Sequence, residues 1–418
     1  MSVGITQTME AHITSGIEDH LIDGLQFKAG SGTAQYVLNS RFVRYFAESG
    51  NRFDSSSSRV IRFRLADHCF LEPASVRLQM TIQNLEGVAL TPVAPPLSMF
   101  RRARCFMASQ LVEDWVELGP TSVLMDRMKP FQRRLNDSLE AHLITGAADS
   151  DSYSPIPPNA ARKVLVQLPF GVLNQPRWLP LHLIAGGLIL ELELGDAADA
   201  FAESAANWQL EGVSLHATCH EVDSALANSY AAHVLKGSPL HLPYQSIVVT
   251  KHILTQGTGT LNLVRGFTRL KQIYFTLHKS GDKPVRDFHH PVGNNALTTA
   301  SDTLTYQLQI GSRRWPERPV SSVPETFMRF RQSAGVFLGS DDVAISPADF
   351  HNKKAVFSID LEKVGNQALY SGYSTKDGSI VTIDYANTGM GAAGDYALVY
   401  LVFDGIVSIR DGAVDVFE

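Results

Sequence analysis

Strict alternation of apolar and polar residues over short runs is the feature that most constrains how this chain folds. In RVIRFRL (59–65), Ile61, Phe63 and Leu65 share one face, and the arginines between them occupy the other. The same period of two residues recurs in SVRLQMTIQ (75–83), LILELELG (188–195) and VSLHATC (213–219). Successive side chains of a strand point to opposite faces, so each run predicts a strand with one buried and one solvated face. Strands of this kind are typical of antiparallel sheets.

Similar runs continue into the second half of the chain, and predicted helices are few. Further strands are predicted at 247–254, 261–264, 270–278, 304–310, 355–361 and 379–385. ALVYLVF (397–403) is apolar throughout, which predicts a strand covered on both faces. Helices are predicted at 121–143, with a break at Pro130, and at 224–237, which ends in a glycine. Short strands without alternating helices predict an all-β chain built of two sandwiches in tandem.

The N-terminal segment has a separate, helical pattern. Its apolar residues recur every four positions, at Ile5, Met9, Ile13, Ile17, Leu21 and Leu25. This spacing predicts an amphipathic helix or arm over residues 1–30. Burying one such side chain is worth about 1.5–3 kcal/mol, so the apolar face requires a partner. The sandwiches have enough apolar alternation to close by themselves, which leaves a neighbouring subunit, a minor protein or a membrane as the partner.

Composition excludes several classes of protein. A length of 418 residues favours two domains, and a net charge of −6 argues against binding nucleic acid through released counterions. The three cysteines, Cys69, Cys105 and Cys219, cannot form a disulfide framework. The start of the chain lacks the pattern of a signal peptide, and no apolar run approaches the ~20 residues of a membrane helix. We therefore expect a soluble protein made in a reducing compartment.

The stretch MASQLVEDWVELGP (107–120) raises the question of catalysis, because Glu113 and Asp114 stand side by side. Three arginines precede them at Arg101, Arg102 and Arg104. Paired carboxylates hydrolyse glycosidic bonds when they flank the bond to be broken. Adjacent residues of a strand point to opposite faces, however, so these two acids are poorly placed for that reaction. The favoured interpretation is structural: the acids anchor a strand end against the nearby arginines.

No other motif predicts a metal, a cofactor or an enzymatic activity. HHP (289–291) has no third ligand in a fitting position and is assigned to a surface loop. His216 and His220 lie on a strand, where both face outward, rather than on a helix at zinc-ligand spacing. GTGTLNLVRG (257–266) lacks the third glycine of a dinucleotide fingerprint and is assigned to a turn. We expect no cofactor, no metal and no hydrolase activity.

Taken in order, these stretches resemble the major capsid proteins of the double jelly-roll lineage, which includes adenovirus hexon, tailless phages, Polinton-like viruses and adintoviruses. The first half contributes 107–120 with its following helix, and the proline-marked loop in VLVQLPFGVLNQPRWLPLHLIAGGLILELELGDAADAF (164–201). The second half contributes GFTRLKQIYFTL (266–277), YQLQIGSRRWPERPV (306–320) and YLVFDGIVSIRDGAVDVFE (400–418). The resemblance runs from about residue 35 to the end of the chain.

The resemblance implies two tandem eight-stranded antiparallel jelly rolls with a few short helices. Their expected bounds are 31–223 and 238–418, joined by the helix 224–237 and preceded by the arm. It also implies a viral major capsid protein located in the virion and assembled inside the host cell. Three chains would form a capsomer of pseudo-hexagonal outline that tiles an icosahedral shell. Expected partners are other copies, penton or minor capsid proteins, and an internal membrane at the arm, without sequence-specific binding of nucleic acid.

Two alternatives stay open on the sequence. One is a single-jelly-roll capsid protein with a projecting domain, although such shells commonly rely on a basic arm that is missing here. The other is a secreted β-sandwich protein that acts on carbohydrates. That alternative requires a signal peptide and carboxylates that converge from separate strands beside exposed aromatic side chains.

Overall fold

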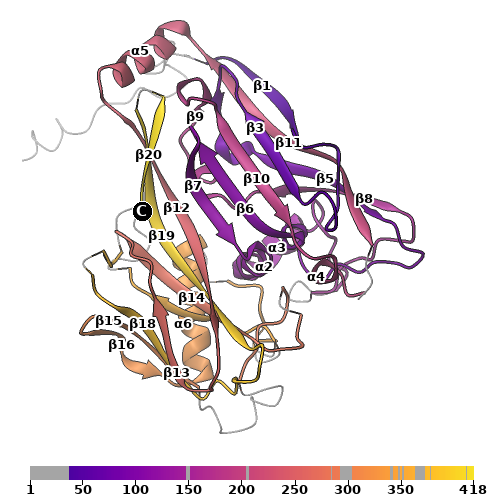
Figure 1. The fold of residues 1–418 in the computed structure, drawn as a ribbon, viewed down its shortest axis with the longest axis vertical. Helices are drawn as coiled ribbons and strands as arrows, with labels where there is room; N and C mark the ends of the chain where they lie inside the picture. The colour runs from indigo at the N-terminus through magenta and orange to yellow at the C-terminus, as the bar shows by residue number, and fades with distance from the viewer. Residues whose placement is uncertain are drawn as a thin grey trace, which may run out of the picture.

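The structure, a computed structural model, describes residues 37–418 except 147–150, 204–206, 284, 292–303, 339–341, 347–348, 351–352, 363–371, 377 and 411. The predicted N-terminal arm therefore lies outside the described residues. The described chain is built around four antiparallel sheets, two in each half (Figure 1). The helix α5 (Ser224–Leu235) lies between the halves in sequence, where a helix over 224–237 was predicted.

In the first half, one sheet has seven strands and the other has four. The larger contains β1 (Val37–Phe46), β2 (Arg52–Phe53), β4 (Phe70–Leu71), β5 (Arg77–Asn84), β8 (Ala161–Gln167), β9 (Leu179–Pro180) and β11 (Trp208–Val222). The smaller contains β3 (Val60–Leu65), β6 (Phe100–Met107), β7 (Gln110–Val116) and β10 (Leu188–Leu194).

In the second half, the sheets have five and four strands. The larger contains β12 (Leu240–Ile253), β14 (Leu270–His278), β17 (Phe357–Asp360), β19 (Tyr396–Arg410) and β20 (Ala413–Phe417). The smaller contains β13 (Gly259–Leu263), β15 (Thr305–Ile310), β16 (Arg313–Val320) and β18 (Val381–Ala386). The other helices are α2 (Leu118–Met128), α3 (Phe131–Asp137), α4 (Ala197–Ala200) and α6 (Val323–Leu338), with short 3-10 turns η2 (Pro73–Ser75), η3 (Pro96–Met99), η4 (Gly171–Leu173) and η5 (Leu181–Leu183).

The two halves share one strand order. With the two-residue strands and β20 set aside, β1-β11-β5-β8 faces β3-β10-β6-β7 in the first half, and β12-β19-β14-β17 faces β13-β18-β15-β16 in the second. In each half, the first, eighth, third and sixth strands form one sheet, and the second, seventh, fourth and fifth form the other. This is the wiring of an eight-stranded jelly roll. The predicted fold class is confirmed, and the second set of strands excludes a single jelly roll with a projecting domain.

Helices follow the same duplication. In the first half α2 and α3 come between the fifth and sixth strands, β7 and β8, and in the second half α6 comes between β16 and β17. Helix α6 was not predicted from the sequence. The helix predicted at 121–143 breaks near Pro130 as predicted, but its second part, α3, ends at Asp137 and not at residue 143, and Leu139 is 81% exposed.

The larger sheet of the second half is covered on both faces. Every residue of β14 is buried. On β14, Phe275 packs into the core of the second half, whereas Tyr274 packs into a core shared with the first half. On β19, Val399 likewise packs into the core of the second half and Tyr400 into the shared core. The prediction that 397–403 is covered on both faces is confirmed, and the halves meet through an apolar interface.

Candidate functional site

The junction between the halves centres on Glu113, which lies on β7 and is buried. Its carboxylate accepts hydrogen bonds from the backbone amides of Gly171 and Val172, both at 2.9 Å. It also accepts the indole N–H of Trp115 at 3.0 Å and the hydroxyl of Ser246 at 2.6 Å. Ser246 lies on β12, so this one carboxylate joins β7, the turn η4 and the first strand of the second half.

The carboxylate of Glu113 is buried and surrounded by hydrogen-bond donors of the protein. Burial raises the pKa of Glu113 above its ordinary value, and the hydrogen bonds from Ser246, Val172, Trp115 and Gly171 oppose that rise. A Cβ atom at Gly171 would collide with the carbonyl oxygen of Gln245, so the two backbones touch where the carboxylate bridges them. All of these partners are groups of the protein itself, which makes Glu113 a structural contact between the halves.

Asp114 points the other way and makes a different contact. It accepts two hydrogen bonds from the guanidinium of Arg102, at 2.8 and 2.7 Å, across the β6–β7 pair. Arg104 pairs instead with Glu191 on β10 at 3.0 Å. Arg101 is exposed. The structure thus brings Asp114 and Arg102 together, whereas Glu113 contacts backbone amides and not the arginines that the sequence analysis expected.

A second polar cluster across the junction was missed by the sequence analysis. The buried guanidiniums of Arg127 on α2 and Arg134 on α3 bind the two oxygens of Asp151, at 2.9 and 2.8 Å. Arg127 also donates to the carbonyl of Arg286 at 2.7 Å and lies 4.5 Å from the centre of the Phe288 ring, and both of those residues belong to the second half.

The charge of Asp151 is held by its neighbours. Burial alone would raise the pKa of Asp151, but Arg127, Lys354 and Arg134 outweigh it and hold the pKa below its ordinary value. Lys354 reaches this carboxylate at 3.7 Å from the second half. Asp151 therefore stays ionised between cations from both halves.

Strand β1 carries the most exposed apolar surface of the first half's larger sheet. Leu38, Phe42 and Phe46 are 68–69% exposed. Phe42 and Phe46 share one face of β1 with Arg44 between them, and Leu38 lies at a shift in the register with β11. We call these three residues the β1 stripe. Within the described chain β1 pairs only with β11, so its other edge has no strand partner. An exposed apolar stripe on an edge strand is typical of a protein–protein contact.

The remaining residues singled out in the sequence are the apolar residues of the arm and four histidines. The six apolar residues of the arm, Ile5, Met9, Ile13, Ile17, Leu21 and Leu25, lie outside the described residues. HHP (289–291) was assigned to a surface loop, but His290 is buried, with its ring near those of Phe350 and Phe357. His216 and His220 were expected to face outward and are also buried, because Phe42 and Trp178 pack on them.

Sequence comparisons find no relatives, whereas structural comparisons do. No protein-family model matches the chain, and no curated protein matches it. None of the helices described is both long and apolar enough to span a lipid bilayer. VP54 of PBCV-1, whose crystal structure was fitted into a reconstruction of the virophage Sputnik, matches with a TM-score of 0.64 at 11% identity, over 93% of this chain and 98% of that one.

Two further solved structures agree. The Faustovirus major capsid protein matches with a TM-score of 0.59 at 8% identity, over 94% of this chain and 93% of that one. The major capsid protein of Sulfolobus Turreted Icosahedral Virus matches with a TM-score of 0.51 at 14% identity, over 87% and 96%. At these identities the similarity establishes the fold. The resemblance noted in the sequence is confirmed at that level: this chain has the double jelly-roll fold of viral major capsid proteins.

Proposed function

We propose that this protein is a viral major capsid protein located in the virion. Three copies form a capsomer of pseudo-hexagonal outline, and these capsomers tile an icosahedral shell. In this proposal residues 31–223 and 238–418 are the two jelly-roll domains, and 224–237 links them. The observation that carries the proposal is a difference between equivalent strands: β7 and β12 meet within the chain, whereas their counterparts in the other half, β16 and β1, are exposed.

The contact within the chain supplies the argument. The first strand of the second half, β12, packs on β7, the fifth strand of the first half (Figure 1). The equivalent first strand of the first half is β1, and among the described residues its stripe stays 68–69% exposed. The equivalent of β7 in the second half is β16, which is exposed along most of its length. A second copy would therefore place its β16 side against the β1 stripe and repeat the internal contact between chains.

Repetition of one contact type leads to a closed ring. Head-to-tail contacts form rings when the rotation between successive units closes. Six jelly rolls in a ring correspond to three chains of this protein, since each chain supplies two. The ring then has true threefold symmetry and an approximately sixfold outline, which suits the tiling of a flat facet.

The β1 stripe provides the test. Phe42→Glu places a charge in the proposed contact, and we expect the trimer to dissociate into folded monomers of 45.8 kDa. Val264→Glu is the matched control, because Val264 is 95% exposed and far from β1 in sequence. Light scattering after size exclusion measures the mass, and negative-stain microscopy shows whether the wild type forms hexagonal plates. A monomeric wild type, or equal behaviour of the two variants, would count against the proposal.

The N-terminal arm is proposed as an assembly element that contacts a neighbouring capsomer, a penton or minor capsid protein, or an internal membrane. A protein lacking residues 1–25 is expected to fold and trimerise with nearly unchanged melting, because described residues from Phe53 onward already supply two extensive apolar cores. It is expected to form no shells, as judged by electron microscopy of assembly reactions. Unfolding of the truncated protein would mean that the arm belongs to a core.

We also propose that the protein is not a hydrolase and binds no specific nucleic-acid sequence. Glu113, one of the two carboxylates considered for glycosidic chemistry, is enclosed by hydrogen-bond donors of the protein. Reproducible turnover of glycan or ester substrates that is abolished by Glu113→Gln would overturn this part of the proposal.

A further inference from the structure

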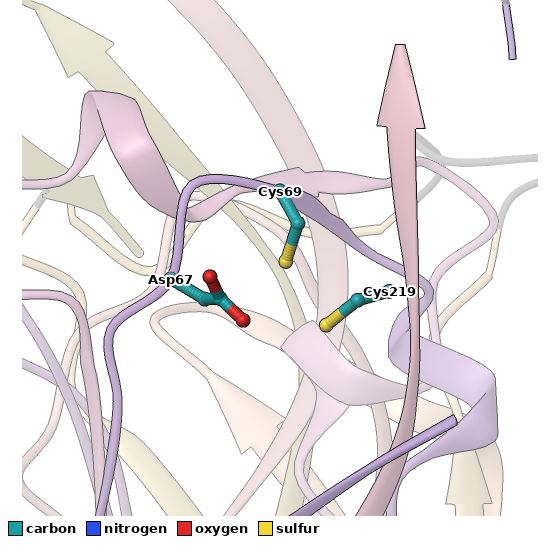
Figure 2. A group of neighbouring side chains, drawn as sticks. All are labelled: Asp67, Cys69 and Cys219. Atoms are coloured by element: carbon teal, nitrogen blue, oxygen red, sulfur yellow. The ribbon is translucent and has the colours of Figure 1, made fainter. Parts of the chain in front are cut away.

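Three metal-binding side chains converge at one end of the larger sheet of the first half. Cys69 precedes β4 directly, Asp67 lies two residues earlier, and Cys219 lies on β11 (Figure 2). Their sulfur and carboxylate oxygen atoms all lie within 4.8 Å of one another. Both cysteines are free and buried, whereas Asp67 is partly exposed. No other group of this kind occurs in the described part of the chain.

The donor set suits one class of metal. Two thiolates select borderline or soft ions such as Zn²⁺, and a carboxylate is an accepted additional ligand. Zn²⁺ binds four ligands in a tetrahedron, with bonds of about 2.0–2.3 Å. Ligand atoms already within 4.8 Å of one another need only a small contraction to reach such a tetrahedron around one ion.

The neighbouring side chains balance the charge. Two thiolates and one carboxylate carry three negative charges, so a bound Zn²⁺ would leave one in excess. Arg41 on β1 supplies positive charge to the site, because its guanidinium donates to both oxygens of Asp67, at 3.1 and 3.0 Å, and it shares that charge with Glu221 at 3.2 Å. Oδ1 also accepts a hydrogen bond from the backbone amide of His68 at 2.8 Å, whereas Oδ2 keeps a second lone pair for a metal. The hydroxyl of Tyr45 lies 3.4 Å from the sulfur of Cys219 and orients it, as outer-shell groups do in metal sites.

We propose that Asp67, Cys69 and Cys219 form a binding site for a divalent zinc-type ion. The protein supplies three ligands, and the fourth position is open to water or to a group from another molecule. Binding of the ion releases the thiol protons and links the β3–β4 connection to β11, the strand that pairs with β1. The proposal concerns the folded chain alone and does not depend on capsid assembly.

Co²⁺ serves as the spectroscopic probe. The full-length protein is reduced, freed of metal with a chelator and titrated with Co²⁺ without oxygen. We expect one Co²⁺ per chain, with a thiolate-to-cobalt charge-transfer band in the near ultraviolet that Zn²⁺ abolishes by displacement. Cys69→Ser and Cys219→Ser should lose the band. Cys105→Ser is the matched control, because Cys105 is equally buried but lies on β6 in the other sheet, and it should keep the band.

Two further measurements keep the proposal falsifiable if a cysteine variant fails to fold. Asp67→Asn retains both sulfurs at a partly exposed position and should weaken Co²⁺ binding about 10-fold or more. Zn²⁺ should raise the melting temperature of the wild type and of Cys105→Ser, and should raise that of Asp67→Asn less at the same concentration. Absence of the band, its persistence in both Cys69→Ser and Cys219→Ser, unchanged affinity in Asp67→Asn, or a Cys69–Cys219 disulfide in protein purified without oxygen would each overturn the proposal.

Discussion

Glu113→Ala is expected to lower the free energy of unfolding by about 3–5 kcal/mol. The substitution leaves four buried donors without an acceptor: the amides of Gly171 and Val172, the indole of Trp115 and the hydroxyl of Ser246. A buried donor that loses its partner costs about 1–3 kcal/mol, and water that enters the space left by the side chain recovers part of the total. Urea-induced unfolding of the purified protein measures the change.

Asp114→Ala is the matched control, because it removes the neighbouring carboxylate from the same strand. Its pair with Arg102 is partly exposed, so its expected cost is about 0–1 kcal/mol. The contrast separates a carboxylate that joins the two halves from one that pairs on the surface. Equal losses in the two variants would show that Glu113 does not hold the junction.

Asp151→Asn is expected to cost about 3–5 kcal/mol, because removing one member of a buried ion cluster leaves the other charges uncompensated. The charges left behind are the buried guanidiniums of Arg127 and Arg134, of which Arg134 keeps its ion pair with Asp126 at 2.6 Å. Glu325→Gln is the control: its pair with Arg329 is a partly exposed pair within one helix, worth about 0.3–0.5 kcal/mol. Denaturant unfolding of both variants gives the comparison, and a loss near that of Glu325→Gln would contradict the role assigned to Asp151.

The same cluster predicts a pH dependence. The pKa of Asp151 is lowered in the folded protein, so the unfolded chain takes up its proton first as the pH falls. The contribution of Asp151 to stability is therefore present above the unfolded pKa of about 3.9 and is lost as the pH falls below it toward the folded pKa. As the pH falls from about 5 to about 3, the free energy of unfolding should decrease more in the wild type than in Asp151→Asn. Parallel pH profiles would contradict the prediction.

The unpredicted helix α6 shows a limit of reading one sequence segment by segment. Val323, Phe327, Phe330 and Ala334 follow a helical spacing, and all four contact the core. Pro324 stands in the first turn, where a missing backbone N–H costs nothing. The signal is thus present in the residues. The strand order also contains it, since α6 occupies the place that α2 and α3 occupy in the first half, but that equivalence is visible only once the strands are paired.

The sequence by itself determined that the chain is all-β, where the helix between the halves lies, and which face of the alternating strands β3, β5 and β10 packs into the core. Apolar alternation fixes these properties because side-chain direction follows local backbone geometry. Only the tertiary structure decided what lies opposite each face. Glu113 contacts Ser246, which is 133 residues away in the chain. Cys219 on β11 lies close to Cys69, which directly precedes the neighbouring strand β4. Periodicity states which way a side chain points but carries no information about its partner, and such partners are chosen by the pairing of distant strands.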